Sequence, residues 1–175
     1  MSVKNISILL IIFTFFSGCF SKIPQANLYE IGFLELSQKE QKEQKSIVLN
    51  LAVSQKIAST KIAYKTSTNS IAYFAKNKWV TPLDIIAQEI AQKSANALSI
   101  ALLDSSETLL KIDILDFYFD VTKEAVVLNA LVNFKDSSFL NKQEVSVKKG
   151  DFGEIIKAFE IALNKSLLEI FSKVR

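Results

Sequence analysis

Side chains that act as nucleophiles, bases or metal ligands are scarce in this chain. It contains no histidine and a single cysteine, Cys19. Ser–His and Cys–His nucleophile pairs are therefore excluded, as are most protein metal sites. The glycines after Cys19 stand at positions 32, 150 and 153, a spacing that builds no phosphate-binding loop. This composition argues against an enzyme and predicts no metal or cofactor site.

Cys19 closes the one long apolar run of the sequence. Lys4 precedes the apolar residues 6–16, and the small residues Ser17 and Gly18 come next. This order is typical of the n-region, h-region and cleavage site of a secretory signal. A buried helix or a membrane span is the alternative for residues 6–16. A span needs roughly 17–25 residues, however, and this run has only about 11.

Four consecutive residues resemble the bacterial lipobox. They are Phe16, Ser17, Gly18 and Cys19, with phenylalanine in the place of the usual leucine. The resemblance implies that residues 1–18 are a lipoprotein signal peptide. It also implies a diacylglycerol on the Cys19 thiol and an N-acyl lipid on the new amine, with no other cofactor. Residues 19–27 would be the lipidated tether of a domain at 28–175. Phe20 replaces the aspartate that commonly retains lipoproteins in the inner membrane, so a periplasm-facing position on the outer membrane is favoured.

Three carboxylates follow one predicted strand and its end, at Asp113, Asp116 and Asp120. Paired carboxylates can act as general acid and base, so a hydrolase that uses Asp113 or Asp116 is one hypothesis. Their mixed spacing does not place all three on one face of the strand, and the sequence shows no basic or metal-binding partner nearby. We therefore interpret them as solvated acids at a strand edge.

The pattern of apolar residues predicts a single α+β domain. Strands are predicted at 28–36, 47–53, 60–65, 71–75, 108–120, 124–135 and 139–149. Residues 37–45 are predicted to be a polar, solvated linker, with a short exposed helix as the alternative. One helix is predicted to reach from Pro82 to about residue 103, with Thr81 as its cap and Asp84 bonded back to the cap amide. A second begins at Asp151 and runs to the C-terminus. This order favours a mostly antiparallel sheet with both amphipathic helices on one face.

Aromatic residues and charge restrict the partners. The run Phe117, Tyr118 and Phe119 places aromatic side chains on both faces of a strand, so one of them meets a second layer, a partner or an apolar groove. The net charge is only +3, and lysines and acids are interspersed. No clustered basic face of the kind that binds nucleic acid is predicted.

The segment 77–82, with the strands before it, resembles the auxiliary lipoprotein family of ABC-type transport systems. Its members show an order of the form I-x-Y, I-x-Y-Y and N-x-W-x-x-P that leads into a helix. The matching residues here, which we interpret as structural, are Tyr64, Tyr73, Asn77, Trp79 and Pro82. Tyr29 and the strand around residues 47–49 stand where the family has its earlier strands. The family's proline-tyrosine-leucine stretch with an arginine has no counterpart in residues 55–60, which puts any role of that loop in doubt.

The resemblance implies an accessory role in lipid transport. Such lipoproteins accompany MCE-domain proteins and ABC transporter components that move phospholipid or other lipid between membranes. The chain would dock or complete such a complex rather than catalyse a reaction. This accessory role is compatible with direct contact between the protein and phospholipid, and with a homo-oligomer. A lipoprotein of outer-membrane assembly, associated with lipopolysaccharide or a β-barrel, is the alternative with a similar α+β layout.

Overall fold

Eight strands and two helices are formed by the residues that the computed structural model describes, which are 25–34, 45–148 and 150–174. The strands are β1 (Asn27–Tyr29), β2 (Lys45–Val53), β3 (Lys61–Lys65), β4 (Ala72–Trp79), β5 (Ile100–Leu102), β6 (Leu109–Asp120), β7 (Ala125–Phe134) and β8 (Ser137–Ser146). The helices are α2 (Leu83–Ala97) and α3 (Phe152–Val174). The lipobox, Cys19 and nearly all of the predicted linker lie outside the described residues.

All eight strands belong to one mixed sheet, and the α+β prediction is confirmed. The longest ladders, β6 with β7 and β7 with β8, are antiparallel, as expected for a meander. β6 also pairs in parallel with β2 and β3. Since β2 pairs with residues 109–114 and β3 with residues 119–120, these two strands follow one another along the same edge of β6.

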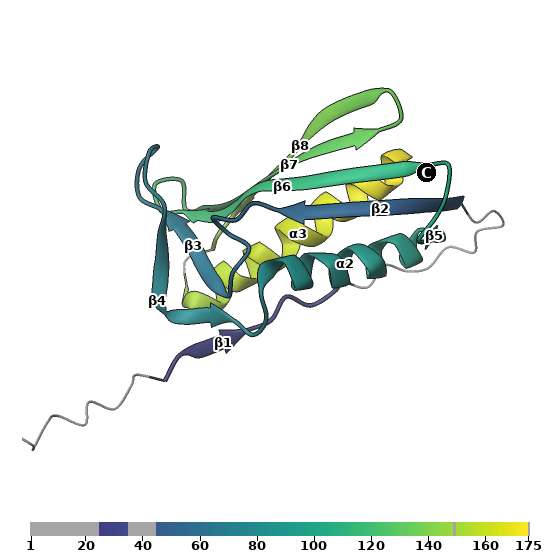
Figure 1. Ribbon diagram of the computed structural model, residues 1–175. Helices are drawn as coiled ribbons and strands as arrows, with labels where there is room; N and C mark the ends of the chain where they lie inside the picture. The colour runs from purple at the N-terminus through teal and green to yellow at the C-terminus, as the bar shows by residue number, and fades with distance from the viewer. Residues whose placement is uncertain (1–24, 35–44, 149, 175) are drawn as a thin grey trace, which may run out of the picture.

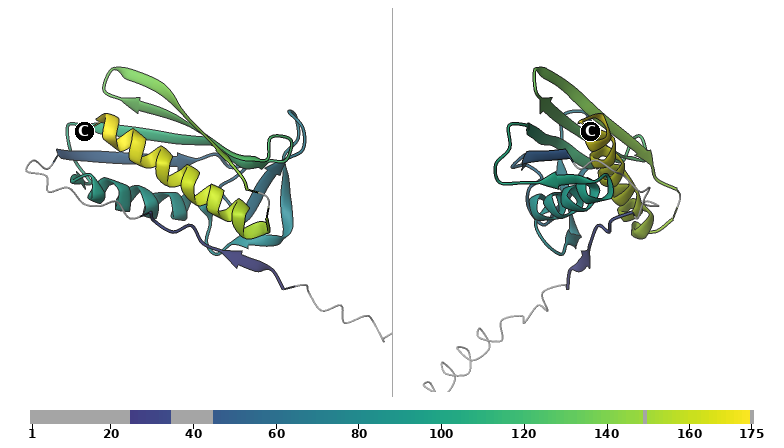
Figure 2. Two further views of the ribbon diagram at one scale, coloured as in Figure 1. Left: turned by 180° about the vertical axis from the view of Figure 1, so that it is seen from behind. Right: turned by 90° about the vertical axis from the view of Figure 1, so that its right-hand side faces the viewer.

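Both helices cover one face of this sheet, as predicted (Figures 1 and 2). The reason is the alternation of apolar residues along the strands, which places Leu110, Ile112 and Phe117 in the core. α3 crosses this face diagonally and contacts β6, β7 and β8, while α2 packs against α3, β2 and β5. The opposite face of the meander carries polar side chains such as Lys111 and Asn129.

The first predicted helix is shorter than expected. It ends at Ala97, and residues 100–102 form β5 beside β2 instead of a last helical turn. Ser99 adopts a left-handed backbone conformation with a φ of 57°, which an α-helix cannot continue through. The apolar residues of β5 continue the helical spacing of α2. A prediction from hydrophobic periodicity alone therefore placed the end of the helix too late in the sequence.

The N-terminus of α2 also differs from the prediction. Pro82 rather than Thr81 occupies the cap position, and no side chain makes a cap hydrogen bond there. Asp84 does not reach back to an amide, since its Oδ1 is buried without a hydrogen-bond partner among the described residues. α3 begins next to Asp151, as predicted, and the Asp151 carboxylate caps it by accepting a 2.8 Å hydrogen bond from the Gly153 amide.

The start of α3 packs against the corner formed by β1, β3 and β4. The Phe152 ring lies 5.1 Å from that of Tyr29 and 4.8 Å from that of Phe74. About two helical turns further in, Phe159 packs edge-on against Trp79 at 5.3 Å and against Phe117 at 4.8 Å. These aromatic contacts fix the corner to the body of the domain.

Candidate docking site

A cavity of about 420 Å³ opens where the meander ends and α3 begins. Its walls come from the end of β6, the turn before β7, the segment after β8 and the first turn of α3. The lining residues are Phe119, Glu124, Val147, Lys148, Gly150, Asp151, Phe152 and Ile155. Because the pairing of the meander strands and the crossing of α3 together bring these segments side by side, the cavity is a product of the fold rather than of one motif.

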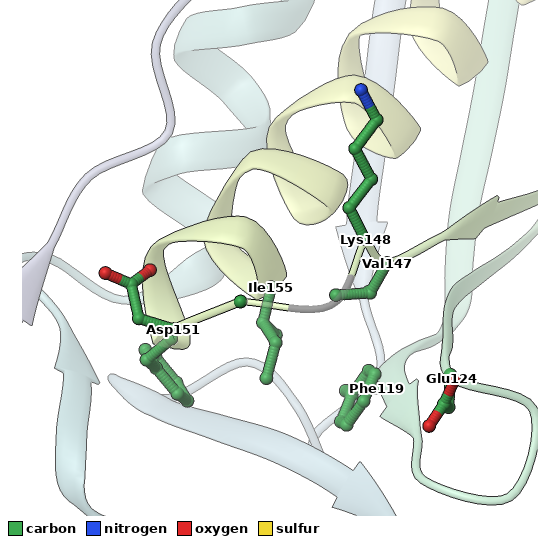
Figure 3. A pocket seen from close by; sticks show the side chains of 8 residues that line it. Phe119, Glu124, Val147, Lys148, Asp151 and Ile155 are labelled. Atoms are coloured by element: carbon green, nitrogen blue, oxygen red, sulfur yellow. The ribbon is translucent and has the colours of Figure 1, made fainter.

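Apolar side chains form the floor of this cavity and charged ones surround it. Figure 3 shows Phe119 and Ile155 pointing toward the open space, whereas the Lys148 ammonium and the Asp151 carboxylate point away from it. The sequence places Phe119 on the same side of β6 as Phe117, toward α3. Such a site can accept an apolar side chain or a lipid chain, with charged groups left at the rim.

The aromatic run on β6 divides between the two faces of the sheet, as alternation predicts. Phe117 is buried against Phe159, and Phe119 lines the cavity, so the predicted apolar groove and second layer are both found. Tyr118 lies on the opposite face, where the ammonium of Lys65 sits 4.2 Å from its ring centroid. This cation–π contact gives Tyr118 a partner within the chain.

The structure separates the three predicted carboxylates instead of gathering them into a reacting group. The Asp113 carboxylate pairs with Lys111 at 3.1 Å. Asp120 accepts hydrogen bonds from the Thr122 hydroxyl at 2.7 Å and from two turn amides, which lower its pKa. Among the described residues, the carboxylates of Asp113 and Asp120 therefore bind only to residues of β6 and of the turn that follows it.

The prediction of acids at a strand edge with no basic partner is wrong, since all three lie on the interior strand β6 and two of them, Asp113 and Asp116, pair with a lysine. Asp116 has two donors. Lys56 Nζ donates to its carboxylate at 2.7 Å, and the Asn129 amide donates at 3.0 Å. Partial burial opposes ionisation, but these two donors outweigh it and hold the pKa of Asp116 below its ordinary value. A bulge beside it leaves Leu115 unpaired in the β6–β7 ladder.

The residues of the family-like motif hold the corner together. The carbonyl oxygen of the Asn77 side chain accepts a 2.9 Å hydrogen bond from the Asn27 amide, across the β1–β4 pair. Trp79 is only 2% exposed, and the Tyr73 hydroxyl donates to the Lys56 carbonyl at 2.6 Å. The rings of Tyr64 and Phe74 lie 4.6 Å apart in a tilted contact, and Pro82 occupies the cap position before α2.

Sequence reasoning missed Asn164, a fully buried polar residue of α3. Its amide accepts from the Leu34 backbone at 3.0 Å and donates to the carbonyls of Gly32 and Glu160, each at 2.9 Å. The signal was present in the sequence, since an asparagine stands among leucines on the apolar face of an amphipathic helix. Asn164 ties the chain after β1 to the helix.

Within the described ranges, no group of acidic side chains gathers in a way that could hold a metal ion. Neither α2 nor α3 has the length and apolar character that crossing a membrane requires.

Two solved structures share this fold. One is an uncharacterised protein that is 16% identical, with a TM-score of 0.68 over 86% of this chain and 99% of its own. The other, a Xanthomonas campestris protein described under the family label DUF330, is 17% identical, with a TM-score of 0.66 over 82% of this chain and 92% of its own. At such identities the likeness is one of fold. The chain matches no family model and no curated protein.

Proposed function

We propose that this protein is a periplasm-facing lipoprotein, held at a membrane through Cys19, that serves as an accessory subunit of an ABC/MCE-type intermembrane lipid transport system. The observation that carries the proposal is the position of Cys19 directly after an apolar run and two small residues. The family-like residues around Trp79 support the assignment to lipid transport. The outer membrane is the membrane we propose.

The described side chains favour docking over catalysis. Asp116 is engaged by Lys56 and Asn129, and Asp113 by Lys111, so their carboxylates serve contacts within the domain. The cavity at the start of α3 offers an apolar floor with charge at its rim, which suits a protein or lipid partner. We therefore assign the partner contact to this cavity.

Purification of the lipidated protein from its own bacterium, in mild detergent, tests the partner. We expect an MCE-domain protein and ABC components to be recovered with it. Recovery of a β-barrel assembly partner in their place would favour the alternative lipoprotein role and contradict the proposal.

Two matched variants locate the contact. Ile155→Gln changes the cavity wall, whereas Ile85→Gln makes the same change on α2, where Ile85 is 43% exposed. Recovery of the transport components should fall for Ile155→Gln and stay unchanged for Ile85→Gln. Equal recovery with both variants would place the docking site elsewhere.

A further inference from the structure

Lysines on the outer side of the corner lie next to one another across strands. Lys61 is opposite Lys78 in the β3–β4 register, and Lys78 is opposite Leu28 in the β1–β4 register. Paired residues of neighbouring strands share a face, so Lys61, Lys78 and Leu28 form one row across three strands. Lys76 is exposed two residues before Lys78 on the same strand.

This row carries positive charge that the domain does not neutralise. Lys56, Lys111, Lys123 and Lys173 each pair with a carboxylate, whereas Lys93, Lys142 and Lys165 form no ion pair among the described residues but lie on three different elements, α2, β8 and α3. Among the described residues, none of the lysines at positions 61, 76 and 78 forms an ion pair, and the exposed Glu30 after β1 makes none with them. The Lys61 ammonium instead lies 5.4 Å from the centroid of the Tyr73 ring. Like charges that face each other across strands destabilise a sheet, so the row costs the domain some stability.

Exposed aliphatic side chains flank the same lysines. Leu28 is 61% exposed and Val80 is 47% exposed. The Val80 amide donates to the Tyr29 carbonyl at 2.8 Å, which keeps Val80 beside β1. Lysines interspersed with exposed aliphatic residues suit the boundary between lipid headgroups and acyl chains.

The short stretch of chain between Cys19 and β1 limits how far the row can lie from the membrane. Only eight peptide steps separate Cys19 from Asn27, the first residue of β1. Fully extended, these steps span at most about 29 Å. A lipid on Cys19 would therefore hold β1, and the row beside it, close to the bilayer.

We propose that Lys61, Lys76 and Lys78, together with Leu28 and Val80, form a basic row that rests on a membrane surface rich in anionic phospholipid. This inference depends on the proposed lipid anchor at Cys19. Each lysine close to such a surface favours the docked orientation by about fivefold. The anchor keeps the protein at the membrane, and the basic row orients the domain on it.

Amine labelling of the lipidated protein in vesicles tests the orientation. The protein is reconstituted in phosphatidylcholine alone and in phosphatidylcholine mixed with phosphatidylglycerol, and the label at each lysine is quantified by peptide mass spectrometry. We expect labelling of the basic row to slow by about fivefold or more in the anionic vesicles, and the effect to disappear at high salt. Labelling of Lys93 and Lys142, which are exposed on α2 and β8, should not change.

A matched pair of triple variants provides the control. Lys61→Gln, Lys76→Gln and Lys78→Gln together remove the labelled amines, so docking of this variant is read by hydrogen exchange of β1 instead. The unsubstituted protein should exchange β1 more slowly in the anionic vesicles than in phosphatidylcholine alone, and the triple variant should lose this difference. The control variant removes the same amount of charge elsewhere, by Lys93→Gln, Lys142→Gln and Lys165→Gln. It should keep the slower exchange of β1 in the anionic vesicles.

The possible failures are separable. Lipidated protein that floats with the vesicles but labels equally in both lipids overturns the basic row and leaves the anchor standing. Protection that requires an added protein partner would identify an acidic protein surface instead and would also overturn the inference. An unmodified Cys19, read from the mass of the N-terminal peptide, would instead overturn the proposed function.

Discussion

On the inner face of the β1–β4 pair, Tyr29 and Trp79 pack against α3, whereas on its outer face Leu28 and Lys78 lie exposed. These residues are immediate neighbours in the chain. The inner pair makes aromatic contacts with Phe152 and Phe159, while the outer pair lies beside Lys61 without a carboxylate partner. One short corner therefore stabilises the domain with one face and leaves the other free for an external surface.

The largest effect should come from the inner face. Trp79→Ala removes a nearly fully buried ring from its contact with Phe159, and we expect a loss of about 3–5 kcal/mol in the free energy of unfolding. Lys76→Ala, on the exposed side of the same strand, should change it by less than about 0.5 kcal/mol. Urea unfolding followed by circular dichroism measures both. Tryptophan fluorescence would not serve, because Trp79→Ala removes the only tryptophan of the chain. Similar losses for the two variants would remove the distinction between the faces.

Asn164 should give the next largest effect, because it holds the chain that follows β1. Asn164→Ala leaves the Leu34 amide and the Gly32 carbonyl without their partner, at an expected cost of about 1–3 kcal/mol. Amide hydrogen exchange of residues 32–34 should quicken at the same time. Asn96→Ala, at an exposed position of α2, is the matched control and should alter neither quantity. Unchanged exchange in Asn164→Ala would show that this side chain does not hold the segment.

A smaller, pH-dependent effect is expected at Asp116, away from the corner. Its pKa is lowered in the folded state, so its contribution is present above the ordinary carboxyl pKa of about 3.9 and is lost as the pH falls through the folded-state value. Because Lys56 is half exposed, we expect Asp116→Asn to cost no more than about 1 kcal/mol near neutral pH. The difference from the unsubstituted protein should shrink below about pH 4. Lys56→Gln should remove part of the same pH dependence. If the stability difference between Asp116→Asn and the unsubstituted protein grew in acid, the lowered pKa of Asp116 would be refuted.

The smallest effect should come from the outer face and have the opposite sign. Lys78→Gln relieves the repulsion from Lys61, so the free energy of unfolding should rise by about 0.2–0.5 kcal/mol. Lys142→Gln, which lies opposite Asn129 rather than another lysine, should leave it unchanged. A clear loss of stability in Lys78→Gln would mean that this lysine supports the fold, contrary to the role we give the basic row.

The strands were predictable from sequence where one face is buried, as in β2, whose alternating residues line up with those of β6. The end of α2 was not, because a left-handed Ser99 is not encoded by hydrophobic spacing and β5 keeps an apolar pattern. The partner of Asp116 was also hidden, since Lys56 is brought to it only by the pairing of β2 and β3 along one edge of β6. The run at 117–119 indicated an apolar groove, but the other walls of the cavity escaped prediction, because the segments that line it meet only in the folded chain.

Mass spectrometry of the N-terminal peptide, from protein made in its own bacterium, tests the central claim most directly. We expect the mature protein to begin at Cys19 and to carry a diacylglycerol and an N-acyl chain. The Cys19→Ser variant should carry neither lipid and should leave the membrane fraction. A mature chain that retains residues 1–18, or that begins at an unmodified Cys19, would contradict both the anchor and the orientation of the basic row.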